Sequence, residues 1–146
     1  MLTIHAADEV RYGTETLKDG AVAVEGSRIA AVGPLEEMRK RFPGARVRSW
    51  PGVLGPGRVH EGPLPDAPSP RERVHAVLKS GATAVREEYV DSPELRAAAT
   101  RNEVLVMASA QSPALTVHGR ADLAVLDDTG ACLATVCAGR LVHRRR

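Results

Sequence analysis

Two short runs of polar side chains near the middle of the chain have the residue types that metal-dependent hydrolysis needs. These runs are His60-Glu61 and Glu87-Glu88. A hydrolytic zinc site takes three protein ligands and leaves a fourth position open for water. His60, Glu61 and Glu87 could together surround a divalent metal. In an exposed loop the same side chains would bind nothing, and for His60-Glu61 this is the interpretation that we favour.

The two glutamates follow a run that is typical of a buried strand, and α/β folds place their sites at the carboxyl ends of parallel strands. Adjacent residues on a strand point to opposite faces, so Glu87 and Glu88 would not act as a paired acid and base. We expect one of them to face solvent and the other to pair with an arginine such as Arg86 or Arg96. All four residues of the two runs therefore stay candidates, and none is assigned as catalytic.

The histidines and cysteines give no further metal-binding pattern. No two histidines stand at the ligand spacing of a helix or a strand, so we expect each to be exposed or bonded to a backbone group. The five are His5, His60, His75, His118 and His143. Cys132 and Cys137 are five residues apart, without a C-x-x-C pattern, which argues against a shared metal and predicts free thiols. We therefore predict no bound metal and no cofactor.

Composition limits the classes of protein that this chain can be. Its 146 residues suit one ordinary domain or two very small ones, and with 3% aromatic residues the core must be built from Val, Leu, Ile and Ala. A net charge of +2 predicts no broad surface for nucleic acid or membrane, and we interpret the run 144–146 of three arginines as a solvated tail. No stretch approaches about 18 apolar residues, and the first residues have no secretory pattern. We therefore expect a cytoplasmic protein.

The first third of the chain has the pattern of strands and turns. Two β-prone runs flank Gly26-Ser27, which predicts a tight hairpin. Pro34 suits the first turn of a helix, and Pro43-Gly44 would end it. The expected hairpin, helix, strand and turn-rich connection lie at residues 21–32, 34–43, 46–50 and 51–57.

The remaining two thirds predict a compact βαβ unit followed by a return to strands. Ser69-Pro70 and Ser92-Pro93 each have the pattern of a capped helix start. Ala138-Gly139 between two β-prone runs predicts a closing hairpin. The expected elements are a loop at 60–68, helices at 69–81 and 92–102, buried strands at 82–85 (with a run on to Val90 left open) and 104–107, and strands at 121–127, 133–137 and 140–143.

Three segments resemble the ends of one enzyme superfamily. DGAVAVEGSRIAAVGP (residues 19–34) is similar to the opening hairpin of amidohydrolases such as imidazolonepropionase and related deaminases. FPGARVRSWPGVLGPGRV (residues 42–59) resembles their approach to the first barrel strand. GRADLAVLDDTGACLATVCAGRLVHRR (residues 119–145) resembles their C-terminal run, in which an aspartate like Asp122 has a structural place. The resemblance covers roughly residues 1–59 and 115–146.

In that family the two ends meet as a small β-sandwich, called the composite domain, and the catalytic (β/α)₈ barrel is inserted between them. The resemblance therefore implies an α+β fold. We expect residues 1–59 and 115–146 to form the sandwich and residues 60–114 to form a truncated α/β insert of the βαβ type. GATAVREEY (residues 81–89) resembles one of the family's barrel strands.

The chain departs from the family at the metal site. There the turn that resembles residues 56–59 runs into a His-x-His pair that holds the metal. Here His60 is followed by Glu61, and Gly62 and Leu64 take the ligand places when the turns are matched without gaps. Residues 58–114 are also too few, because a closed barrel needs about 200 residues.

These departures predict an amidohydrolase-like protein without the metal site, acting as a non-catalytic binding or regulatory module or as a partner subunit. Surfaces that a barrel would cover should be exposed, so we expect a homo-oligomer, such as a homodimer, or a protein partner. The alternative is a metal-dependent hydrolase of non-peptide carbon–nitrogen bonds, whose zinc site is completed in an oligomer. A weaker third idea is a small-molecule ligand in the βαβ unit.

Overall fold

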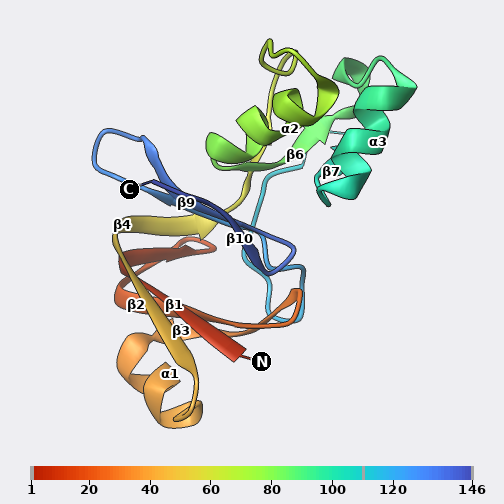
Figure 1. Cartoon of the computed structure of the whole chain (residues 1–146). Helices are drawn as coiled ribbons and strands as arrows, with labels where there is room; N and C mark the ends of the chain where they lie inside the picture. The colour runs from red at the N-terminus through yellow and green to blue at the C-terminus, as the bar shows by residue number, and fades with distance from the viewer. Residues whose placement is uncertain (1, 110, 146) are drawn as a thin grey trace.

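The computed structural model describes residues 2–109 and 111–145, which form two sheets and three α-helices (Figure 1). The first seven elements are β1 (Leu2–Tyr12), β2 (Glu15–Glu25), β3 (Arg28–Pro34), α1 (Leu35–Arg41), β4 (Arg46–Pro56), β5 (Arg58–His60) and α2 (Pro70–Lys79). The others are β6 (Ala82–Arg86), a 3₁₀ turn (Glu87–Tyr89), α3 (Pro93–Arg101), β7 (Leu105–Met107), β8 (Leu123–Leu126), β9 (Cys132–Cys137) and β10 (Arg140–Arg144).

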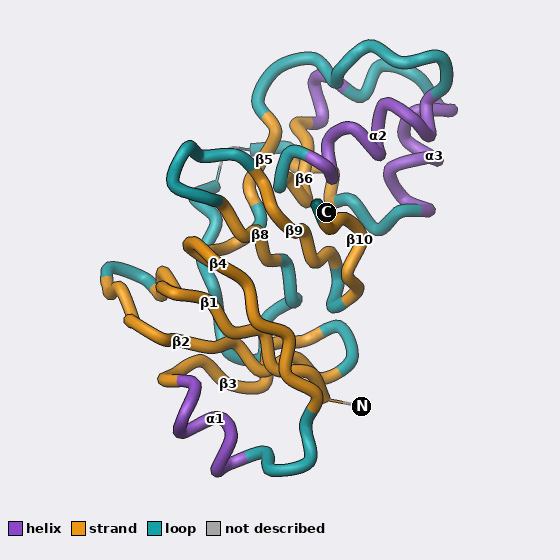
Figure 2. The backbone as a smooth tube through the Cα atoms, turned by 60° about the vertical axis from the view of Figure 1, so that its left-hand side comes forward, coloured by secondary structure: helices purple, strands orange, loops and turns teal. Residues whose placement is uncertain are grey.

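Seven strands from both ends of the chain form one mixed sheet in the order β10-β9-β8-β4-β1-β2-β3. Side chains from β1 to β4 pack against side chains from β8 and β9 in one apolar cluster, which includes Val10, Val22, Leu54, Leu123 and Val136. The sheet therefore folds over itself, and the tube in Figure 2 shows the strands of both ends in this one body. This is the α+β composite sandwich that the sequence predicts.

The outer face of β1, β2 and β3 is covered by α1. Ile4, Ala21 and Ala23 are fully buried on this face, and Met38 from α1 packs on them. Small side chains on the strands let the short helix lie close to the sheet. The helix ends before Pro43 as expected, with the Phe42 N–H donating to the carbonyl of Met38 (2.9 Å).

Strand β4 corrects the expectation of a turn-rich connection at residues 51–57. The strand runs through Pro51 and Gly52 to Pro56, parallel to β1 and then antiparallel to β8. The pairing of β4 with β1 shifts by one residue opposite Asp8, with the extra residue in β4. There Gly52 takes a positive φ (95°) and donates its N–H to the Asp8 carboxylate (2.9 Å). The irregularity is confined to Pro51 and Gly52, so the Pro- and Gly-rich composition does not end the strand.

The turns of two hairpins, one from each end of the chain, meet at one point of the sandwich. The Ala121 N–H donates to the carbonyl of Ser27 (2.8 Å), and the Gly139 N–H donates to the carbonyl of Ala121 (2.9 Å). Asp122 accepts from the Ala138 N–H (2.9 Å) and from Arg120 Nε (2.9 Å). The aspartate that resembles the family's structural aspartate therefore fastens the closing hairpin.

Strands β5, β6 and β7 form a second, parallel sheet. We call this sheet, together with α2 and α3, the α/β insert. Both helices cover one face of this sheet, in a cluster that includes Val74, Val77, Leu95 and Val85. The predicted capping serines are confirmed, because the hydroxyls of Ser69 and Ser92 accept backbone N–H groups three residues further on. Residues 58–60 add a short strand where the sequence predicted the loop to begin, and the strand at 82–86 ends in the 3₁₀ turn instead of running to Val90.

The insert packs on the sandwich through β9 and β10. The Thr135 hydroxyl donates to the carbonyl of Leu78 (2.7 Å), and Cys137 and Val142 belong to the apolar cluster of the insert. Both cysteines are free, as expected. Across residues 2–109 and 111–145, no helix has the length and apolarity needed to cross a bilayer.

Alanine at Gly139 tests the junction of the two hairpin turns. Gly139 has φ 83°, and a Cβ there would collide with the carbonyl of Gly26 in the opposing turn. Gly139→Ala should therefore lower the free energy of unfolding in urea by about 2 kcal/mol or more beyond Gly130→Ala. Gly130 is the matched control, because it has φ 85° with open space around its Cβ. Equal losses in the two variants would show that the turns do not touch.

The burial of His5 on β1 predicts how the stability of the protein depends on pH. Its side chain is 3% exposed and accepts from Trp50 Nε1 (3.3 Å), whereas the sequence predicted exposure or a backbone partner. Burial, with the charge of Arg48, lowers the pKa of His5 to about 4 from an unfolded value of 6.5. The unfolded chain then binds the extra proton, so acid removes stability between pH 6.5 and pH 4, by roughly 3 kcal/mol at most.

His5→Gln, which keeps an acceptor and removes the titration, should be less stable than the native chain at pH 7 and should lose less stability on acidification. Urea unfolding at pH 7, 5.5 and 4.5 measures both slopes. His118→Gln is the matched control for the substitution, because His118 is exposed on the loop before β8. An unchanged slope in His5→Gln would contradict a neutral, buried His5.

Candidate functional site

The candidate site lies at the carboxyl ends of β5 and β6, where the alternation of the strands divides the side chains between two faces. Val85 faces the helices, and His60 is paired with it in register. Arg86 is paired with Met107 on the other face, which the helices leave uncovered. The strands therefore send Arg86 and His60 to opposite sides of the sheet.

Arg86 is the centre of an ion-pair network on the uncovered face. Its Nη1 lies 3.2 Å from Glu61 Oε2, and its Nη2 lies 3.4 Å from Glu88 Oε1. The Arg86 side chain is 20% exposed, against 65% for Glu61 and 60% for Glu88. Its Nε is buried with no hydrogen-bond partner in the described part of the chain. One largely shielded guanidinium thus holds two carboxylates that come from different elements.

Glu87 turns away from this network and pairs with Arg96 on α3, with 3.5 Å between Arg96 Nη2 and Glu87 Oε1. The opposite directions expected for Glu87 and Glu88 are thus present. Both glutamates are more than half exposed, and each pairs with one of the two arginines that the sequence suggested, where only one such pair was expected. The 3₁₀ turn at residues 87–89, which the sequence pattern did not predict, directs the two side chains to different arginines.

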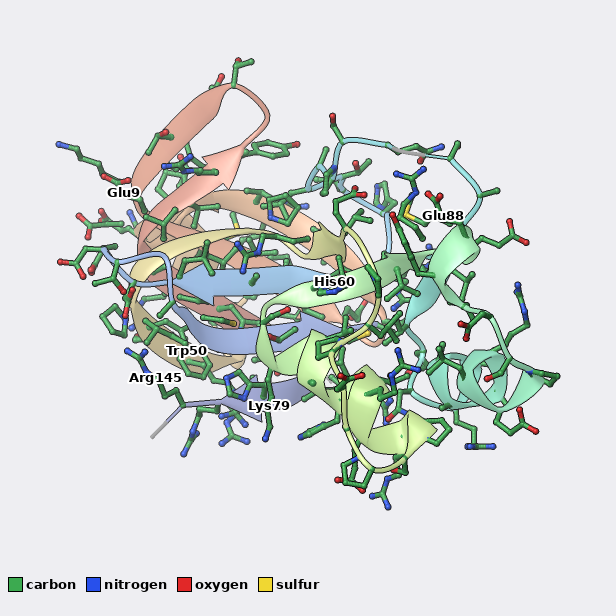
Figure 3. The ribbon with its side chains drawn as sticks, turned by 90° about the horizontal axis from the view of Figure 1, so that it is seen from above. Glu9, Trp50, His60, Lys79, Glu88 and Arg145 are labelled. Carbon is green, nitrogen blue, oxygen red and sulfur yellow. The ribbon has the colours of Figure 1, made fainter. Side chains whose placement is uncertain are left out.

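His60 is bound to its own loop. Its Nε2 donates to the carbonyl of Pro63 (3.1 Å), so its second nitrogen would be the one left for a ligand. Figure 3 labels His60 and Glu88 on their separate elements of the insert. Leu64, at one of the two family ligand places, is 3% exposed and belongs to the apolar cluster under the helices. The side chains present at this edge therefore do not fit the metal that the fold family implies.

Within residues 2–109 and 111–145, no three His, Cys, Asp or Glu side chains gather closely enough to hold one metal ion. The remaining histidines lie apart from the candidate site. His75 and His118 are exposed on α2 and on the loop before β8, and His143 is half-buried on β10. Burial raises the pKa of the Cys137 thiol to about 11, so this cysteine stays protonated and unreactive at neutral pH.

The uncovered face of the insert lines a cavity of about 280 Å³ between the sheet and the loop at residues 111–116. Val59, Ala84, Leu105 and Met107 supply its apolar wall. Leu105 is 41% exposed, which is high for a large apolar side chain. Sequence analysis did not find this cavity, although the alternation of Leu105 and Met107 with the buried Val104 is a signal that could have found the face.

Comparison with known proteins supports the resemblance read from the sequence. Residues 20–45 match the family model of the imidazolonepropionase-like composite domain of bacteria. Among solved structures, this chain is similar to an adenosine deaminase from Xanthomonas campestris with bound zinc (TM-score 0.55, 23% identity). The match covers 72% of this chain and 33% of that one. No curated protein sequence matches the chain.

Two further structures give the same result. A guanine deaminase from Bradyrhizobium japonicum matches with a TM-score of 0.53 and 16% identity, over 73% of this chain and 34% of that one. The ochratoxinase of A. niger matches with a TM-score of 0.50 and 21% identity, over 72% of this chain and 30% of that one. At such identities the likeness shows the fold. The chain spans about a third of the length of these proteins.

The ion-pair network predicts unequal effects for its two arginines. Arg96 is 50% exposed and holds one carboxylate, so Arg96→Gln should change the free energy of unfolding by less than about 0.5 kcal/mol. Arg86→Gln removes a shielded charge that holds two carboxylates and should cost about 1–2 kcal/mol. Urea unfolding of the two matched variants measures the difference. Equal costs would mean that Arg86 does not organise this edge.

Proposed function

We propose that this chain is a non-catalytic binding or regulatory module. Its residues 20–45 match the imidazolonepropionase-like composite domain, and its α/β insert has three parallel strands where an amidohydrolase barrel has eight. The chain would bind another protein or a second copy of itself. The cytoplasm is the proposed compartment, which the two free thiols support. Hydrolysis would then belong to the complete relatives and not to this chain.

The observation that carries the proposal is the place of Arg86. A metal site in this fold would need free carboxylates or imidazoles at the carboxyl ends of the parallel strands. Here those ends carry a fixed positive charge, already neutralised by Glu61 and Glu88. A divalent cation placed there would be repelled by the guanidinium and would have to compete with it for the same oxygen atoms.

The remains of the barrel support the same proposal. Three parallel strands stand where a closed barrel has eight, so the walls that exclude water from a hydrolytic site are incomplete. The face with Leu105 and Met107 is left without a covering layer of helices or strands in the described part of the chain. Apolar surface of this kind is usually covered by a partner, which supports a homodimer or a protein partner.

Metal analysis of the full-length purified chain tests the proposal. After growth with added zinc, we expect zinc and other divalent metals far below one per chain. Adenosine and guanine, whose deaminases share the fold, should remain unchanged when incubated with the protein. Size-exclusion chromatography at high concentration should show a dimer if the uncovered face pairs with a second copy.

The contrary result is also well defined. Stoichiometric zinc that is lost in His60→Ala, but retained in the exposed control His118→Ala, would contradict the proposal. It would favour the alternative, a hydrolase of non-peptide carbon–nitrogen bonds with its site completed in an oligomer. A clean monomer over the whole concentration range would remove the homodimer and leave a different protein as the partner.

A further inference from the structure

The first half of β4 is an open edge of the large sheet. Strand β8 pairs with β4 only over Val53–Pro56, so residues 46–50 have β1 on one side and, among residues 2–109 and 111–145, no strand on the other. No backbone hydrogen bond of a loop or turn reaches these five residues within the described part of the chain. Outward-pointing N–H and C=O groups of this segment are therefore available to another extended chain.

Basic side chains gather at this open edge. Arg46 and Arg48 alternate along β4 and so project from the same face of the strand. Arg144, at the end of β10, lies near them. The pKa of Arg48 is lowered, first by burial and then by the positive charges of Arg46 and Arg144. We call these three residues with the backbone of residues 46–50 the arginine edge.

The arginine edge has more positive charge than its surroundings neutralise. None of its three guanidiniums is ion-paired with a carboxylate of the described residues, whereas the neighbouring Arg145 is held by Asp127 (3.0 Å). Figure 3 labels Arg145 and Trp50 at this end of the sandwich. Like charges that converge in this way repel one another, and an anionic partner would offset that repulsion.

The edge is also held in a fixed shape. Trp50 projects from the same face of β4 as Arg48, and its indole packs on the core cluster of the sandwich. The Trp50 ring is stacked on His5 at an interplanar angle of 11°. A rigid strand with regularly spaced charges presents a binding surface at little cost in conformational entropy.

We propose that the arginine edge binds an acidic, extended segment of a partner protein, which adds to the sheet as a strand beside β4. Strand addition uses the free backbone groups for affinity and side chains at every second residue for specificity. Arg46 and Arg48 repeat at about 7 Å, the spacing of alternate residues on an extended chain, so alternate glutamates or aspartates would meet them. The inference rests on the proposed function and names the surface and the partner class.

Charge favours this occupant over two others. A second copy would bring its own arginines to the same edge, so self-pairing there is opposed by repulsion. The phosphates of a nucleic acid would neutralise the arginines, but they would leave the row of backbone donors and acceptors without strand pairing. An acidic β-strand uses both features at once.

Fluorescence anisotropy with the full chain tests the proposal at low salt. The probe is a fluorescein-labelled ten-residue peptide of alternating glutamate and threonine. The first control peptide replaces each glutamate by glutamine and should bind at least tenfold more weakly. The second keeps every glutamate but replaces two central threonines by proline, and should bind at least fivefold more weakly because the backbone pairing is lost.

Protein variants locate the surface. Arg48→Gln should weaken binding of the acidic peptide about tenfold, which is the loss expected for a charge-assisted hydrogen bond. Arg144→Gln, at an exposed strand end, should act in the same direction without touching the core. Arg101→Gln on α3 is the matched control and should leave the dissociation constant unchanged. Circular dichroism of each variant confirms that it is folded.

Three results would overturn the proposal. Equal binding of the proline peptide would show electrostatic attraction without strand addition. Tighter binding of a ten-residue oligothymidylate would identify nucleic acid as the occupant. Failure of the acidic peptide to bind at millimolar concentration would remove the surface altogether. None of these changes the metal content of the chain, so the docking surface and the proposed function fail separately.

Discussion

The structure depends on the antiparallel pairing of β4 with β8, which joins the two ends of the chain. Without it, the apolar faces of β1, β2 and β4 would have no covering layer, because the residues that complete their cluster come from β8 and β9. The contacts between the two hairpin turns and the hydrogen bonds of Asp122 hold this arrangement at its far end. The α/β insert has its own apolar cluster and is joined to this arrangement through Thr135 and Cys137 on β9 and Val142 on β10.

The α/β insert keeps the local structure of a parallel β/α unit and arranges the polar side chains at its strand ends in its own way. The sheet keeps its parallel order and its helices, because these are stabilised by local capping and by a cluster of Val, Leu and Ala. The polar side chains at the strand ends are arranged by a different interaction, in which Arg86 neutralises two glutamates. The charges at this edge are thus neutralised by one another, without a metal ion.

Local signals in the sequence predicted most of the elements. Proline and serine at helix starts, glycine at turns and the alternation of Val and Ala all act over a few residues, and the helices and hairpins follow them. These local signals do not show which strands pair at long range, although the family resemblance predicted that the two ends of the chain meet. Strand β1, which the sequence analysis did not identify, and the continuation of β4 through Pro51 are fixed by neighbours far along the chain. At the candidate site, the two arginine partners were foreseen, but the convergence of Glu61 and Glu88 on one guanidinium depends on how β5 and β6 are aligned.

The pairing of Val53 with Leu126 also bears on how the protein is made. More than seventy residues must be synthesised after the first of these before the second can meet it. Until then the nascent chain has an incomplete sheet, whose apolar inner face is exposed to water and prone to aggregation. Loop closure over such a span slows folding. Strands β1 to β4 would therefore remain only partly folded until β8 and β9 have been synthesised. Apolar surface of β1 to β4 therefore stays exposed until strands far along the chain have been made.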